Sequence, residues 1–281
     1  MQNALTFDVE DYFHVHNFET TIDRSEWDSM PSRVVSSTRR ILGLLRERQV
    51  RATFFVLGWV AERHPQLVQE ITADGHELAT HGYGHELIYR QSPAEFTEDV
   101  ERSLRFLKLA LGGSEVPIQG YRAPAFSVTR QTLWALRILR EHGFRYDSSI
   151  FPLVAHDRYG IRNASRFASQ VEAGLWEFPV STVRLAGRNW PVAGGGYFRL
   201  FPLWLTRSAI RHINGEGHPA VIYLHSWEFD PNQPAVRGAP ALSRFRHYVN
   251  LRKTESRLRK LLEEFRFGAF QDVFAHQLGV S

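Results

Sequence analysis

Short apolar runs along the chain alternate with segments whose apolar residues recur at helical spacing. Seven runs predict buried strands, because each is short, mostly apolar and bounded by polar or turn-forming residues. They span residues 4–9, 52–57, 76–80, 117–122, 144–150, 175–181 and 220–226. Amphipathic patterns predict helices at residues 33–49, 65–73, 93–111, 129–142 and 203–214. The alternation indicates an α/β fold in which helices surround a parallel sheet or barrel.

The predicted organisation is a single domain over residues 1–281. No repeat, low-complexity block or linker-like stretch appears before about residue 231. From there a loop-like stretch leads into a charged segment with helical character. We therefore expect a core over about 1–230 and a C-terminal helical extension over about 231–281.

Composition excludes several classes of protein. The chain has 43% hydrophobic residues and a net charge of +4, and its basic residues are spread out rather than gathered in a block. We therefore expect no nucleic-acid partner. Because there is no cysteine, disulfide scaffolds, thiolate zinc sites and cysteine nucleophiles are excluded.

No targeting or membrane-spanning segment stands out in the sequence. The first residues, "MQNALTFDVED", have neither the basic nor the apolar region of a signal peptide. No stretch approaches the roughly 18 apolar residues of a membrane span. We expect a cytoplasmic protein, either free or attached peripherally at the inner face of the membrane.

Polar residues interrupt the predicted strands at or just past their C-terminal ends. In an α/β barrel these ends converge on one face, and that face carries the chemistry. Five residues on five different strands hold such positions: Asp8, His81, Arg122, Asp147 and His225. The pattern predicts that they meet at one site.

Two histidines in "ATHGYGHEL" are candidates for metal ligands. His81 and His85 are four residues apart, with Gly82 and Gly84 between them. Each glycine would cost about 1 kcal/mol in a helix interior, so the pair is predicted on a loop. The alternative is that both are surface or capping histidines, and the spacing alone does not exclude it.

Three carboxylates in "TFDVEDYF" accompany the histidines. A metal held by two neutral imidazoles needs an anionic ligand, and a hydrolytic site also needs a base. Strand alternation puts Asp8 and Glu10 on one face, whereas Asp11 would require a bend. The alternative is that these carboxylates cap helices or lie on the surface.

The ordered motifs resemble those of the polysaccharide deacetylases with a NodB homology domain, carbohydrate esterase family 4. The matching pieces over about 1–230 are "TFDVED", "HGYGH", "RAP", "YDSS" and "YLHS". "DVEDYFHV", "HDRYG" and "GGGYFR" further resemble the subgroup found with bacterial exopolysaccharide loci. The resemblance implies a distorted (β/α) barrel and removal of acetyl groups from N-acetylated sugars.

The resemblance also implies roles for the strand-end residues. Asp8 would be the general base, paired with Arg122, and His225 the general acid, oriented by Asp147. His81 and His85 would bind one divalent metal ion together with either Glu10 or Asp11. Zinc is the expected metal, with cobalt, nickel or manganese as the other candidates.

Further residues are expected to contact the substrate. The backbone N–H of Ala125, which follows "RAP", would help to bind the oxyanion, although many family members have tyrosine there. His156, Tyr159 and Tyr197 lie in two segments that would form a loop over the substrate, and Trp227 would stack on a sugar ring. A structural loop and core packing are the respective alternatives.

The expected function is metal-dependent de-N-acetylation of an N-acetylhexosamine polymer, oligosaccharide or precursor. Peripheral association with a polysaccharide-assembly machinery is the partner that the resemblance implies. One alternative is an amidohydrolase with the same barrel that cleaves a small non-sugar amide. A second alternative is a sugar-binding protein without catalysis, and the histidine and carboxylate set disfavours it.

Overall fold

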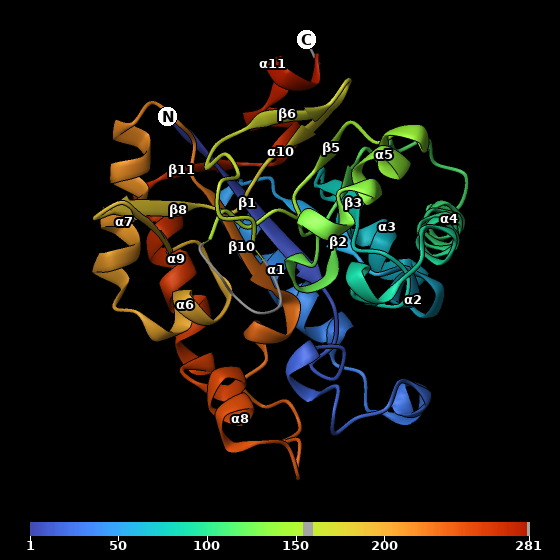
Figure 1. The fold of residues 1–281 in the computed structure, drawn as a ribbon. Coiled ribbons are helices and arrows are strands. Elements are labelled where there is room, and N and C mark those ends of the chain that lie inside the picture. The colour runs from blue at the N-terminus through green and yellow to red at the C-terminus, as the bar shows by residue number, and fades with distance from the viewer. Residues whose placement is uncertain (154–159, 280–281) are drawn as a thin grey trace.

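The computed structural model describes residues 1–153 and 160–279. Its main element is a nine-stranded sheet with the order β10-β1-β2-β3-β4-β5-β7-β6, and β11 pairs with β1 beside this path (Figure 1). The strands are β1 (Gln2–Val9), β2 (Thr53–Val56), β3 (Glu77–Thr80), β4 (Gly120–Tyr121), β5 (Tyr146–Asp147), β6 (Ser169–Glu172), β7 (Leu175–Glu177), β10 (Val221–His225) and β11 (Arg266–Gly268).

All strand pairs in this sheet are parallel except β6 with β7. The seven predicted strands are present, although most are shorter than their apolar runs. The central strands β1 and β2 are buried on both faces, because helices cover one face and the curled sheet encloses the other. The prediction of an α/β fold of the distorted barrel type is confirmed.

Helices surround the sheet on its outer side (Figure 1). They are α1 (Val34–Arg48), α2 (Gly58–Arg63), α3 (Pro65–Ala73), α4 (Pro93–Ala110), α5 (Trp134–Glu141), α6 (Gly195–Leu200), α7 (Leu203–Gly215), α8 (Ala241–Tyr248), α9 (Thr254–Glu264), α10 (Phe270–Val273) and α11 (Ala275–Leu278). None of the helices among the described residues has the length and apolar content that crossing a membrane requires.

A hairpin and its flanking residues bridge the open side of the barrel. It consists of β8 (Thr182–Leu185) and β9 (Arg188–Pro191), and its two-residue turn has positive φ at Ala186 and Gly187. Before the hairpin, the Ser181 N–H donates to the carbonyl of Val221 on β10. After it, the Tyr223 N–H donates to the carbonyl of Ala193. These bonds tie the hairpin segment to β10.

The C-terminal segment contains helices α8, α9, α10 and α11, as predicted, and it also adds a strand to the sheet. β11 pairs with β1 at Gln2–Ala4, inside the sheet. Phe270 and Phe274 are buried and pack against Phe178, which follows β7. Residues after 230 therefore help to build the core, and the charged character of the segment in sequence concealed these few apolar positions.

Candidate active site

A cavity of about 400 Å³ lies where the C-terminal ends of the central strands meet. Its walls contain most of the residues that the sequence singled out. Those that line it are Asp8, Glu10, His81, His85, Ala125, Tyr197, His225 and Trp227. Residues from α6 and α8 form the opposite wall.

Sheet register brings Asp8 and His225 together. The two residues are direct partners on the neighbouring parallel strands β1 and β10. Nε2 of His225 lies 3.8 Å from Oδ2 of Asp8 and 3.9 Å from Oε1 of Glu10. Although 217 positions separate Asp8 from His225 in sequence, adjacent strands make them neighbours.

Arg122 lies directly behind Asp8. Its Nη1 donates hydrogen bonds to Oδ1 of Asp8 at 2.7 Å and to Oγ1 of Thr6 at 2.9 Å. Its Nη2 donates to Oγ of Ser148, and the guanidinium stacks on the ring of Phe55. Arg122 is fully buried, so this ion pair is shielded from solvent. The expected Asp8–Arg122 pair is thus present in the structure.

Glu10, His81 and His85 form the one cluster of three metal-ligand side chains found among the described residues. One potential ligand atom of each lies within 4.8 Å of the others. Nε2 of His85 is 2.9 Å from Oε2 of Glu10. His81 uses Nδ1 to contact the carbonyl of Arg122 at 2.8 Å, and its Nε2 remains for a ligand.

The protonation of these groups suits a cation. Burial lowers the pKa of His81 to about 4, so the imidazole is neutral and can act as a ligand near pH 7. Burial alone would raise the pKa of Glu10, but the charge and hydrogen bond of His85 outweigh it and lower that pKa. Two imidazole nitrogens and one anionic carboxylate oxygen form a suitable set for zinc or a similar divalent ion.

The loop between the two histidines is held in an uncommon conformation. Gly82 has φ of +75°, and a Cβ there would lie 2.8 Å from Oδ2 of Asp99 on α4. That carboxylate accepts the N–H groups of Tyr83 and Gly84. His85 has φ of 52°, which is costly for a residue with a side chain. The surrounding contacts therefore fix the backbone that aims His85 at Glu10.

Asp11 has a different position from Glu10. Its carboxylate accepts the N–H groups of Arg33 and Val34 at the start of α1 and the hydroxyl of Ser32. Of the two carboxylates that the sequence left open, the structure brings Glu10 to the histidines and leaves Asp11 as a helix cap. Alternation along β1 gives the same result.

Trp227 supports Glu10 from the side. Its indole N–H donates to Oε1 of Glu10 at 3.0 Å, and its ring stacks on those of His225 and His247. The side chain is almost fully buried. Trp227 was expected to stack on a sugar ring; in the structure it lines the cavity while holding a candidate ligand.

His225 is oriented by Glu228, not by Asp147 as expected. Its Nδ1 donates to Oε1 of Glu228 at 2.6 Å. The other oxygen of Glu228 accepts a 2.6 Å hydrogen bond from Nε of the buried Arg199. Burial alone would lower the pKa of His225, but the hydrogen bond and charge of Glu228 prevail and raise it to about 9.

Asp147 belongs to a separate buried pair. It is the register partner of Glu177 on β7 and accepts a hydrogen bond from Ser149. Burial raises the pKa of Asp147 to about 6, and burial together with the charge of Asp147 raises that of Glu177 further. Asp147 is not among the residues that line the cavity, and its carboxylate is engaged by Ser149 and Glu177 instead.

The remaining expected substrate residues have mixed outcomes. Ala125 lines the cavity with φ of 50°, in a short turn after Arg122. Tyr197 on α6 also lines it. His156 and Tyr159 lie outside the described residues.

Sequence reasoning missed Glu228 and Arg199 as site residues. A signal for Glu228 was available, since "HSWE" places an acid three residues after His225, within reach of its ring on a tight turn. Arg199 lies 29 positions before Glu228, and nothing local pairs the two.

The fold and the cavity define an α/β barrel with a candidate metal centre flanked by a carboxylate and an imidazole. Comparison with family models gives two adjacent matches. Residues 20–146 match the polysaccharide deacetylase model, and residues 148–275 match a domain of unknown function (DUF3473).

Individual relatives agree with the first match. A chitooligosaccharide deacetylase of Bradyrhizobium sp. (strain ANU 289) is 36% identical over 73 residues, 26% of this chain and 33% of its own. A peptidoglycan-N-acetylglucosamine deacetylase of Bacillus cereus is 31% identical over 71 residues, 25% of this chain and 33% of its own. The chain thus matches about a third of the length of these curated relatives.

The fold has a solved counterpart. The crystal structure of a candidate polysaccharide deacetylase from Mycobacterium smegmatis aligns with a TM-score of 0.63 at 22% identity. The alignment covers 98% of this chain and 89% of the other. Residues 20–146 thus match the polysaccharide deacetylase family, and the fold of the whole chain agrees with that of a solved candidate deacetylase.

Proposed function

We propose that this chain is a metal-dependent hydrolase that removes acetyl groups from N-acetylhexosamine units of a bacterial exopolysaccharide or its precursor. The supporting observation is that the cluster of Glu10, His81 and His85 shares one cavity with the Asp8–His225 pair. The relatives named as chitooligosaccharide and peptidoglycan deacetylases support N-acetylated sugars as the substrate class.

The three clustered side chains would hold the metal, since they combine two buried imidazoles with a charged carboxylate. A divalent cation bound there would polarise the acetyl carbonyl and make a water molecule more acidic. Trp227 fixes one oxygen of Glu10 and leaves the other directed at His85. Supporting bonds of this kind commonly orient metal ligands.

The other cavity residues would move protons and stabilise charge. Asp8, which lies outside the ligand cluster, takes a proton from the attacking water, and Arg122 keeps its carboxylate in place. His225 carries a proton at neutral pH and gives it to the departing amine, because an unprotonated amine is a very poor leaving group. The backbone N–H of Ala125 is the candidate donor to the oxyanion.

The test is acetate release from N-acetylglucosamine oligomers by the zinc-loaded protein. Asp8→Asn should lower turnover by about 10²- to 10⁴-fold, as loss of a general base does, while bound metal stays at the wild-type level. Asn has the same size and still accepts a hydrogen bond from Arg122, so the fold should be preserved. Substantial activity in Asp8→Asn would contradict the base assignment.

The same assay separates the rival functions. A small-amide hydrolase would release formate or ammonia from a substrate panel and no acetate from the sugar oligomers. A sugar-binding module would bind the oligomers without turnover and could not be reconstituted with any divalent metal.

A further inference from the structure

Most of the exposed large apolar side chains belong to two segments that each contribute residues to the cavity. Nine large hydrophobic residues are exposed among the described residues, and six of them lie within 178–215 or 231–254. These two segments contain only 62 of the 281 residues. The six are Leu185, Trp190, Leu200, Trp204, Leu242 and Phe245.

Both segments lack acidic residues altogether. Neither 178–215 nor 231–254 contains an aspartate or a glutamate, whereas the rest of the chain carries all 30. Several basic side chains in them are exposed and have no ion-pair partner among the described residues. These are Arg184, Arg188, Arg237, Arg244, Arg246, Arg252 and Lys253.

The fold connects the two segments at the mouth of the cavity. Leu200 on α6 and Phe245 on α8 both line the cavity while remaining about half exposed, at 47% and 55%. Buried Arg199 joins the two helices by donating to the carbonyls of Arg246 and His247. Figure 1 shows α6, α7 and α8 on the same side of the barrel, away from α4 and α5.

We propose that the surface formed by Leu200, Trp204, Leu242 and Phe245, with Arg237, Arg244 and Arg246, binds a lipid bilayer that contains anionic phospholipids. Leucine and aromatic side chains insert at the apolar–polar boundary of a bilayer, and unpaired arginines bind its anionic headgroups. On α8, Leu242 and Phe245 are three residues apart and share one helix face.

The position of this surface would bring the mouth of the cavity to the membrane. Because Leu200, Phe245 and Arg246 also line the cavity, contact with a bilayer would hold the cavity mouth at headgroup level. A substrate carried on a lipid would then reach the site from the membrane plane. Aliphatic Leu200 and Leu242 offer little to a sugar ring, which stacks on flat aromatic faces, so the bilayer accounts better for the whole set.

The test is co-sedimentation of the full chain with vesicles. Wild type should bind vesicles of equal phosphatidylcholine and phosphatidylglycerol, and binding should weaken in phosphatidylcholine alone or in high salt. Trp204→Ser with Leu242→Ser should weaken binding at least about tenfold, since two apolar anchors are lost. Arg237→Gln with Arg244→Gln should do the same through charge.

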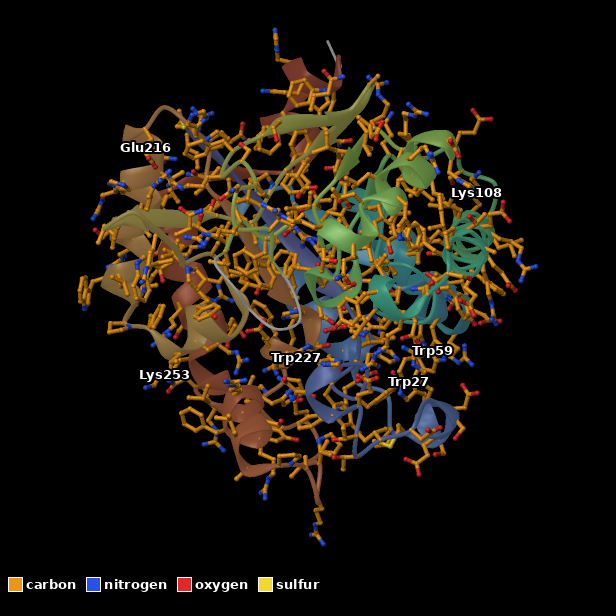
Figure 2. All side chains as sticks on the ribbon, in the orientation of Figure 1. Trp27, Trp59, Lys108, Glu216, Trp227 and Lys253 are labelled. Carbon is orange, nitrogen blue, oxygen red and sulfur yellow. The ribbon has the colours of Figure 1, made fainter. Side chains whose placement is uncertain are left out.

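Matched variants control for exposed surface in general. Leu109→Ser with Leu133→Ser removes two apolar side chains, 67% and 43% exposed, on α4 and just before α5. Lys108→Gln with Arg130→Gln removes charge there, and Figure 2 shows Lys108 and Lys253 on opposite sides of the molecule. Neither control pair should change vesicle binding, and thermal melting should confirm that all variants fold.

Several outcomes would overturn the proposal. They are no vesicle binding by wild type, equal binding to neutral and anionic vesicles, or equal losses in patch and control variants. Self-association that the patch variants abolish, without vesicle binding, would instead assign this surface to a second copy of the chain. Vesicle binding needs no turnover, so a negative result leaves the deacetylase proposal intact.

Discussion

The two halves of the chain supply the cavity with different kinds of group. Residues 20–146, which match the polysaccharide deacetylase model, bring His81 and His85 on a loop held by backbone contacts. Residues 148–275, which match the domain of unknown function, bring His225 with its charged supports Glu228 and Arg199. The Asp8 segment precedes both matches.

The two halves of the chain therefore meet different physical requirements at the cavity. The first half positions the two imidazoles of the candidate metal site, for which a rigid loop is sufficient. The second half must keep an imidazole protonated in a buried place, and that requires the carboxylate of Glu228. Arg199 in turn lowers the pKa of Glu228, which burial alone would raise. The segment that matches the domain of unknown function thus contains the proposed proton donor and part of the cavity wall, and variants in each half should fail differently.

The largest loss is expected in the first half, from His81→Ala. Loss of a residue that only supports a metal ligand lowers metal affinity by about 10- to 100-fold. Removing one of the three proposed ligands themselves should lower metal affinity by more than that. The deacetylation rate should fall by more than about 10⁴-fold, which exceeds the loss expected when only a proton donor is removed. Metal content by mass spectrometry and acetate release measure the two effects.

His142→Ala is the matched control, because His142 is half-buried on the helical surface and bonds to Ile138 and Glu101. It should retain both metal and activity. A His81→Ala protein that holds a full equivalent of metal would contradict the ligand assignment.

A smaller loss with metal retained is expected in the second half, from His225→Ala. Turnover of the amide should drop by about 10²- to 10⁴-fold, the usual contribution of a general acid. Hydrolysis of 4-nitrophenyl acetate should suffer much less, because nitrophenolate leaves without a proton. Equal losses on the amide and the ester would show that His225 does not act as the acid.

Local pattern predicted much of this molecule. The strand runs and the periodicity of the helices specified the α/β barrel, and strand-end positions singled out Asp8, His81 and His225. What sequence could not supply were pairings between distant elements. Glu228 rather than Asp147 supports His225 because η6 (Ser226–Phe229) turns back onto the ring, whereas β5 directs Asp147 toward Glu177.

The smallest effect is expected from Glu228→Gln, which keeps the hydrogen bond to Nδ1 of His225 and removes the charge. His225 acts as the acid in its protonated form, so activity should fall as pH rises through its pKa of about 9. Without the carboxylate the pKa of His225 drops, so the alkaline limb of the pH–rate profile should shift to lower pH by about one pH unit or more. At pH 6 the rate should stay within about tenfold of wild type.

Two measurements distinguish this effect from general damage. Glu228→Gln leaves Arg199 without its buried partner, so thermal melting should show a loss of about 3–5 kcal/mol in the free energy of unfolding. Glu177→Gln removes another buried carboxylate that faces Asp147 instead of the cavity, and its alkaline limb should stay where the wild type has it. A limb that moves equally in both variants would mean that pH acts on the stability of the sheet. A limb that moves in Glu228→Gln alone would place the titrating proton on His225, in the half of the chain that matches the domain of unknown function.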